Sequence, residues 1–287
     1  MSGFFGLFNY SAPGKGVSKD TRRKRGFFVF LEVFWRKIWQ FFTLSLEFTL
    51  IAIPCFIAYL GISMFVMSVG LQHSTTNGLY VIYAAVSMAL FLTAFLGAGP
   101  ASMGRALVLR CYARESHAFI WGDFIDGVKD HIGRSLLIFL IDALVTSVAS
   151  FNIIFCFAET QTMLPEVFLL ASGMLTVIIV LLWLMVHPYL HLLTVTHDMS
   201  FGDTYKTAFS LAFVKLVPNL VVTVISAAIF MLFIYLTLTT GIVFVLLFPL
   251  LLFSLCGFIT HFNAARTMDA YFEEEKEDYD DESIFLD

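Results

Sequence analysis

The sequence alternates between long apolar runs and short polar connections. Six apolar runs cover residues of about 40–69, 79–99, 135–157, 165–193, 217–237 and 241–262. A helix needs roughly 20 apolar residues to cross a hydrocarbon core of about 30 Å. The pattern therefore predicts an all-α, polytopic membrane protein with six transmembrane helices in three hairpins. The first run is so long that we expect it to tilt, to kink at Pro54 or to project beyond the bilayer.

Three connections carry a shorter helical pattern just before an apolar run. The segments "WGDFIDGVKDHIGR" (121–134) and "FGDTYKTAFSLAFVK" (201–215) both open with an aromatic residue, a glycine and an aspartate. Asp123 and Asp203 are good N-cap residues, and apolar side chains follow at helical spacing. Residues 27–39 show similar spacing, although less clearly. We expect three amphipathic elbow helices on the cytoplasmic membrane surface, each preceding one hairpin.

The same pattern divides the chain into three parts. Residues 1–26 form a basic N-terminal segment, 27–265 the six-helix membrane domain, and 266–287 an acidic tail. The acidic tail is typical of a solvated, disordered segment. Its apolar ending also makes it a candidate for docking on a partner, through Ile284, Phe285 and Leu286.

The basic residues all fall on one side of the predicted topology. Of the 17 Lys and Arg residues, eight precede the first span, five lie between the second and third, two lie between the fourth and fifth, and two follow the sixth. The opposite connections, "LQHSTTNG", "AETQTML" and "TLTTG", contain none. Cytoplasmic loops carry the excess of Lys and Arg, so we expect both termini in the cytoplasm.

Composition agrees with a membrane location and disfavours several other classes. The chain is 59% hydrophobic and 14% charged, whereas soluble domains are near a quarter charged. A net charge of -5 argues against nucleic-acid binding. The segment "GPASMGRA" (99–106) has phosphate-loop spacing, but Arg105 and Ala106 replace the required Lys and Ser/Thr. Pro100 as a helix terminator and small residues for close packing explain it better. No motif predicts an enzyme, a metal site or a cofactor.

Ionisable residues inside the apolar runs are the main candidates for chemistry. Glu47 and Asp142 lie within predicted spans, where a carboxylate costs about 2.5 to 3.5 kcal/mol and is a functional candidate by default. Structural anchoring by water or a neighbouring group is the alternative interpretation. The segment "HPYLH" sets His187 and His191 one helical turn apart. Pro188 between them indicates a kink or a helix exit.

Several segments resemble the YesL family of bacterial membrane proteins. The resemblance is carried by "FNYSAPGKGVSKD", "GPASMGRAL" and "HAFIWGDFIDGVKDH". The segments "HPYLHLLTVTHDM" and "DESIFLD" are similar to the longer clostridial members. The resemblance implies a bacterial cell membrane location and supplies no catalytic residues. The family-like positions, which are candidates for structure or partner contact, are Gly99, Pro100, Asp123, Phe124, His187, Pro188, Tyr189 and Asp198.

Two functions follow from these observations. Genes of the YesL family commonly lie beside those for carbohydrate ABC importers, so the resemblance implies a non-catalytic auxiliary component that contacts importer permease subunits. The residues themselves offer the alternative of a small-solute transporter or channel that uses Glu47, Asp142 and the His187/His191 pair.

Overall fold

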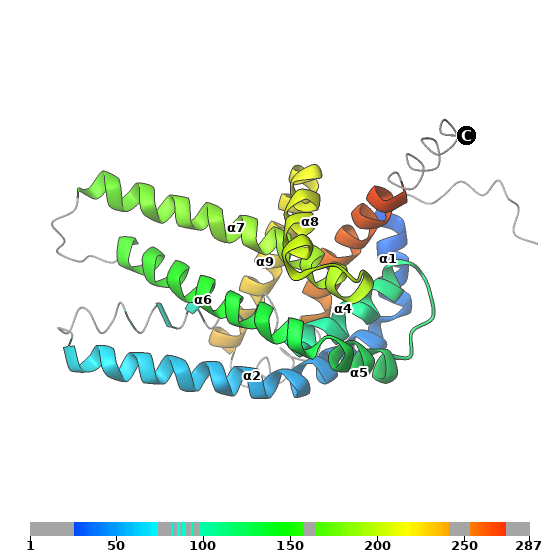
Figure 1. The fold of residues 1–287 in the computed structure, drawn as a ribbon, viewed down its shortest axis with the longest axis horizontal. Helices are drawn as coiled ribbons and strands as arrows, with labels where there is room; N and C mark the ends of the chain where they lie inside the picture. The colour runs from blue at the N-terminus through cyan, green and yellow to red at the C-terminus, as the bar shows by residue number, and fades with distance from the viewer. Residues whose placement is uncertain are drawn as a thin grey trace, which may run out of the picture.

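The computed structural model describes residues 26–73, 98–157, 165–240 and 253–273, with positions 82, 85, 86, 88, 89 and 93. These parts form α1 (Gly26–Arg36), α2 (Ile38–His73), α4 (Pro100–Ala113), α5 (Ile120–Asp130), α6 (Ile132–Phe157), α7 (Glu166–Thr196), α8 (Phe201–Val214), α9 (Leu216–Thr240) and a last helix over residues 253–273. Within these ranges there is no strand, which confirms the all-α prediction for them. α2, α6 and α7 follow the long axis of the molecule, and α1, α4 and α5 gather at one end (Figure 1).

Four of these helices are long and apolar enough to cross a membrane. The segments are Ile38–Phe65, Ile132–Cys156, Glu166–Thr196 and Leu216–Phe233. Large apolar side chains stay exposed on all four, for example Leu50, Leu144, Val167 and Val221. Contiguous exposed apolar surface of this kind requires lipid around it, so the chain is a multi-pass integral membrane protein. Most of the predicted span 79–99 and the first part of 241–262 lie outside the described residues.

Two prolines lie inside the long helices without ending them. α2 continues through Pro54 to His73, and α7 continues through Pro188 to Thr196. The interpretation of Pro188 as a helix exit is therefore wrong. An internal proline removes one backbone hydrogen bond, and transmembrane helices tolerate this loss where neighbouring helices re-satisfy the freed carbonyl.

A short helix precedes a long apolar helix three times. α1, α5 and α8 are followed by α2, α6 and α9 after breaks at Lys37, His131 and Lys215. These short helices coincide with the segments 27–39, 121–134 and 201–215 in which elbow helices were expected. The repeated arrangement joins a short amphipathic segment directly to a spanning segment.

The predicted N-caps of two short helices are wrong. α5 begins after Phe119, and Asp123 lies in its first turn, where Oδ2 accepts a hydrogen bond from the Phe119 backbone N–H at 2.9 Å. α8 is capped by Ser200, whose Oγ accepts from the Asp203 N–H at 3.2 Å. The Ser200 hydroxyl in turn donates to the Asp203 carboxylate. Asp203 and Ser200 thus form a reciprocal pair, whereas Asp123 contacts only the backbone N–H of Phe119. An acidic group in the first turn also interacts favourably with the helix dipole.

α4 is the most central helix of the described fold. It contacts α1, α2, α5, α6 and α7 and is buried along nearly its whole length. Gly99 caps it with φ 49° and ψ -116°, a conformation that L residues rarely adopt. Pro100 follows as the first helical residue, where its missing N–H costs nothing. Pro100 therefore starts a helix, which corrects its predicted role as a terminator.

Small residues let α4 and α5 approach closely. A Cβ on Gly104 would lie 2.5 Å from the carbonyl oxygen of Phe124, and one on Gly127 would lie 3.0 Å from the Gly104 Cα. Phe124 itself is fully buried. The glycine spacing in "GPASMGRA" serves this backbone contact. Phe124 thus has a packing role in the core.

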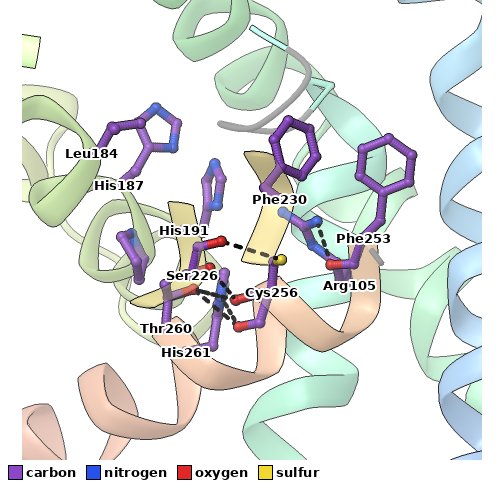
Figure 2. Close-up of a pocket in the computed structure, with 12 residues that line it drawn as sticks. Arg105, Leu184, His187, His191, Ser226, Phe230, Phe253, Cys256, Thr260 and His261 are labelled. Atoms are coloured by element: carbon purple, nitrogen blue, oxygen red, sulfur yellow. Dashed lines mark hydrogen bonds between the residues drawn. The ribbon is translucent and has the colours of Figure 1, made fainter. Parts of the chain in front are cut away.

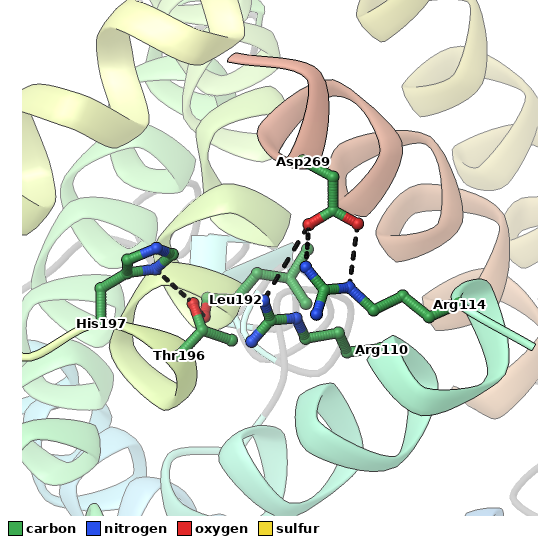
Figure 3. Close-up of polar contacts among 6 residues, drawn as sticks. All are labelled: Arg110, Arg114, Leu192, Thr196, His197 and Asp269. Carbon is green, nitrogen blue, oxygen red and sulfur yellow. Dashed lines mark hydrogen bonds and ion pairs between the residues drawn. The ribbon is translucent and has the colours of Figure 1, made fainter. Parts of the chain in front are cut away.

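An ion pair joins the end of α4 to the last helix. Arg114 donates from Nε to Asp269 Oδ2 at 3.0 Å and from Nη2 to Oδ1, and Arg110 lies on the other side of the same carboxylate (Figure 3). The hydrogen bond from Arg114 raises its pKa. The last helix continues to residue 273, past position 266 where the acidic tail was expected to begin, and Asp269 lies in this part.

We predict that Gly104→Ala lowers the stability of the purified protein by about 1–3 kcal/mol, because the new methyl group overlaps backbone that cannot rotate away. Thermal unfolding in detergent measures the effect. Gly122→Ala is the matched control in α5, since its Cβ would meet only Phe119 at 3.7 Å. Equal unfolding temperatures for the two variants would contradict the proposed α4–α5 contact.

Candidate functional site: a buried arginine–histidine cluster

An aspartate in α6 is held by two side chains of α7. Asp142 is 2% exposed, and its Oδ1 accepts a hydrogen bond from Trp183 Nε1 at 3.0 Å. His187 Nε2 lies 2.8 Å from the same oxygen. Trp183 and His187 are four residues apart, so one face of α7 presents both groups to Asp142. The contact fixes α6 against α7 within the apolar bundle.

Two further histidines, His191 and His261, continue from His187 across the bundle. The ring of His187 lies 4.6 Å from that of His191, and His191 lies 5.8 Å from His261 on the last helix. His261 Nδ1 is 2.8 Å from the carbonyl oxygen of Gly257. A carbonyl can only accept, so Nδ1 carries a proton and Nε2 of the neutral ring is an acceptor. That Nε2 and the Nδ1 atoms of His187 and His191 are buried without hydrogen-bond partners.

Arg105 of α4 brings a full positive charge to the same region. It is 3% exposed, and its Nη1 donates to the carbonyl oxygen of Phe253 at 3.2 Å. The guanidinium carbon lies 4.4 Å from the centre of the Phe48 ring. Nε is buried without a partner. Burial lowers the pKa of Arg105 to about 10, so the side chain stays charged at neutral pH.

Arg105, the three histidines and three further polar side chains line one cavity. Its volume is about 30 Å³, and its lining also includes Ser226 of α9 with Cys256 and Thr260 of the last helix (Figure 2). A cavity needs about 10–15 Å³ to hold one water molecule, so there is room for one or two. In the part of the chain that the structure describes, no carboxylate lines the cavity and none lies within 4 Å of a nitrogen atom of Arg105.

The energetics of the cavity are dominated by the buried guanidinium. An isolated charge removed from water costs several kcal/mol unless it is paired and hydrogen-bonded. Here one carbonyl and one aromatic ring offset part of the cost, and the Nε–H group has no hydrogen-bond partner. The cavity is therefore a region of positive potential within an apolar bundle.

Some of the predicted candidates meet at this cluster and others do not. His187, Pro188 and His191 line the cavity, and Asp142 touches it through His187. Glu47 lies on α2, is 4% exposed and is not part of the lining; its Oε2 has no hydrogen-bond partner. Asp198 is exposed and lines a separate surface depression with residues 130–134. Ile284, Phe285 and Leu286 lie outside the described residues.

Tyr189 belongs to a neighbouring structural network. Its hydroxyl donates to Asn219 Oδ1 at 2.9 Å, and Asn263 Nδ2 donates to the same oxygen at 2.7 Å. Asn219 Nδ2 donates to the carbonyl oxygen of Ala212 at 2.9 Å. These contacts tie α7, α8, α9 and the last helix together. Tyr189 thus holds the helices that carry the cluster.

Sequence reasoning missed Arg105, His261 and Trp183 as members of the site. Arg105 was considered only as a failed phosphate-loop lysine, and His261 stood unnoticed in the run "GFITHFN". The signal available was the rule already applied to Asp142, that an ionisable residue in apolar surroundings is a candidate site. The described residues contain no group of three or more potential metal ligands that could hold an ion.

Comparison with family models, with curated proteins and with solved structures gives no match. What defines the class of this chain is its own structure, a multi-pass helical membrane protein with a buried arginine–histidine cluster.

We predict that Asp142→Leu destabilises the protein by about 2–3 kcal/mol, because Trp183 and His187 lose their acceptor inside the bundle. Trp183→Phe removes a single donor and should cost about 1 kcal/mol. His187→Leu added to Asp142→Leu should recover part of the loss, since fewer polar groups remain unpaired. Thermal unfolding of the variants in detergent gives the ranking. An Asp142→Leu variant as stable as the wild type would refute the anchoring role.

Proposed function

We propose that this chain is a multi-pass protein of the bacterial cell membrane that binds a small solute at the Arg105 cluster and moves it across the bilayer. The proposal rests on one observation: a charged Arg105 shares a cavity with His187, His191 and His261, and the described lining of this cavity contains no carboxylate. His187 and His191 lie in the candidate span Glu166–Thr196, and ionisable residues inside membrane spans are costly and are candidates for solute or proton pathways by default. This moves the small-solute alternative ahead of the auxiliary function.

The size of the cavity limits what the solute is. Pockets for drug-sized ligands have about 300–1,000 Å³, whereas this cavity has about 30 Å³. A sugar does not fit such a space without large rearrangement. A proton, a water molecule or a small ion does, so we assign this site to solutes of that size.

The topology that we propose has six spans in three hairpins, each preceded by a cytoplasmic elbow helix. Exposed aromatic side chains on the short helices and their flanks support it, namely Phe27, Trp35, Trp39, Phe119 and Trp121. Tryptophan and other aromatic residues prefer the headgroup level, where an apolar ring meets water. The one-sided distribution of Lys and Arg places that level on the cytoplasmic face.

Cysteine labelling tests the topology. In a variant whose native Cys55, Cys111, Cys156 and Cys256 are replaced, single cysteines at positions 114 and 206 should react with an impermeant thiol reagent only from the cytoplasmic side. Cysteines at positions 73 and 239 should react only from outside. Labelling of positions 73 and 114 from the same side would contradict the proposed arrangement.

A second candidate function is the auxiliary component of a carbohydrate ABC importer. Two observations favour it: the resemblance to the YesL family, and the exposed aromatic side chains of α1 and α5 at the level where importer subunits also present helices. In this function the solute passes through the partner permease. The buried cluster then has a supporting role in the stability of the auxiliary protein.

One pair of measurements separates the two functions. We predict that wild-type protein in liposomes carries a flux of protons or small ions, that Arg105→Gln abolishes it, and that Arg266→Gln, an exposed change on the last helix, leaves it intact. Absence of any flux through folded protein, together with capture of permease subunits by cross-linking in native membranes, would replace the first function by the second.

A further inference from the structure

The Arg105 cavity lacks the group that its charge requires. Arg105 has one described hydrogen bond, and its buried Nε donates to nothing. Water satisfies a polar group but does not neutralise a charge. An anion does both, and a hydrogen bond between two charged groups is about twice as strong as one between neutral groups. The unfilled donor therefore points to an anionic ligand.

The cavity also limits the class of anion. Its volume of about 30 Å³ accommodates a species near the size of one or two water molecules. Halide ions are only slightly larger than water, whereas phosphate esters and carboxylate metabolites are much larger. Ser226 and Thr260 also line the wall, but their hydroxyl groups donate to the backbone carbonyls of Cys256 and Gly257, so Arg105 is the donor on which an anion depends.

The tautomer of His261 links the anion to a proton. Nδ1 is committed to the Gly257 carbonyl, so the neutral ring turns an unprotonated Nε2 to the interior of the protein. An anion next to that lone pair is repelled, whereas an anion next to a protonated Nε2–H is bound. Because an anion also offsets the repulsion between Arg105 and an imidazolium, binding of the anion favours protonation of His261.

The charged and titratable groups around His261 agree with this coupling. α4 contributes Arg105, α7 contributes His187 and His191, and the last helix contributes Cys256. α9 contributes only Ser226 to the polar part of the lining. Asp142 of α6 is one step removed, because it is bound to His187 and Trp183. Among the described residues of the lining there is no carboxylate that would compete with an anion for Arg105.

We propose that the cavity binds one small monovalent anion of the halide class together with one proton on His261. This inference deepens the solute-binding function proposed above and rests on it. The complex adds no net charge to the site, since the anion and the proton arrive together. Arg105 holds the anion, and His261 makes its occupancy depend on pH, with tighter binding as the pH falls.

The test uses the full-length wild-type protein in detergent, with gluconate as the background anion. We expect saturable broadening of the ³⁵Cl NMR line on adding chloride, its reversal by bromide, and uptake of about one proton per anion in unbuffered solution. Binding should tighten on acidification. Arg105→Gln should weaken binding on the order of tenfold or more, and His261→Gln should abolish proton uptake. Arg266→Gln is the control and should bind like the wild type.

The outcomes that overturn the proposal are distinct from failure of transport. Folded wild-type protein without saturable broadening shows that the cavity holds water alone. Binding that Arg105→Gln leaves unchanged places the anion elsewhere. If Arg105→Gln does not fold, Arg105→Lys keeps the charge but loses the planar fork, and it should still weaken binding. Anion binding without flux in liposomes would rule out the transport function and support the anion site. Flux that halides do not affect would rule out the anion site and support the transport function.

Discussion

A guanidinium withdrawn from water inside an apolar bundle is the constraint on which the rest of the structure depends. Arg105 lies on the central helix, and among the described residues its charge is offset by the Phe253 carbonyl and the face of Phe48. An unpaired charge there is costly, so the surrounding helices must either supply polar groups or hold a counter-ion. The three histidines, Ser226 and Thr260 converge on the cavity beside it. These polar side chains therefore lie around the buried charge of Arg105.

Close packing is what brings these polar groups together. Gly104 lies one residue before Arg105, and its lack of a side chain lets α5 press directly on the backbone of α4. On the opposite side, Gly257 leaves room for the Arg105 side chain, since a Cβ there would lie 3.3 Å from Nε. The Tyr189–Asn219–Asn263 network then holds α7, α9 and the last helix in register. The cluster is thus positioned by contacts that are themselves outside the cavity.

The sequence predicted four long apolar helices that the structure confirms, because the length of an apolar run is a local quantity. It also located the short helices 120–130 and 201–214, since amphipathic spacing is local too. The cluster was harder, because Arg105 and the Phe253 carbonyl are separated by 148 residues and no spacing rule connects them. Asp142 and His187 were each recognised, but their pairing depends on how α6 packs against α7. The two predicted N-caps were wrong by a few residues. In α8, serine and aspartate both suit the N-cap position, so the sequence pattern does not choose between Ser200 and Asp203.

Anomalous diffraction at the bromine edge, from crystals grown in bromide, would show whether the Arg105 cavity binds a halide. We expect one anomalous peak in the cavity, within hydrogen-bond distance of the Arg105 guanidinium and of His261 Nε2. Contrary evidence would be a cavity without a peak in which Arg105 is paired with a carboxylate such as Glu47. In that case the cluster would be a structural ion pair of the bundle.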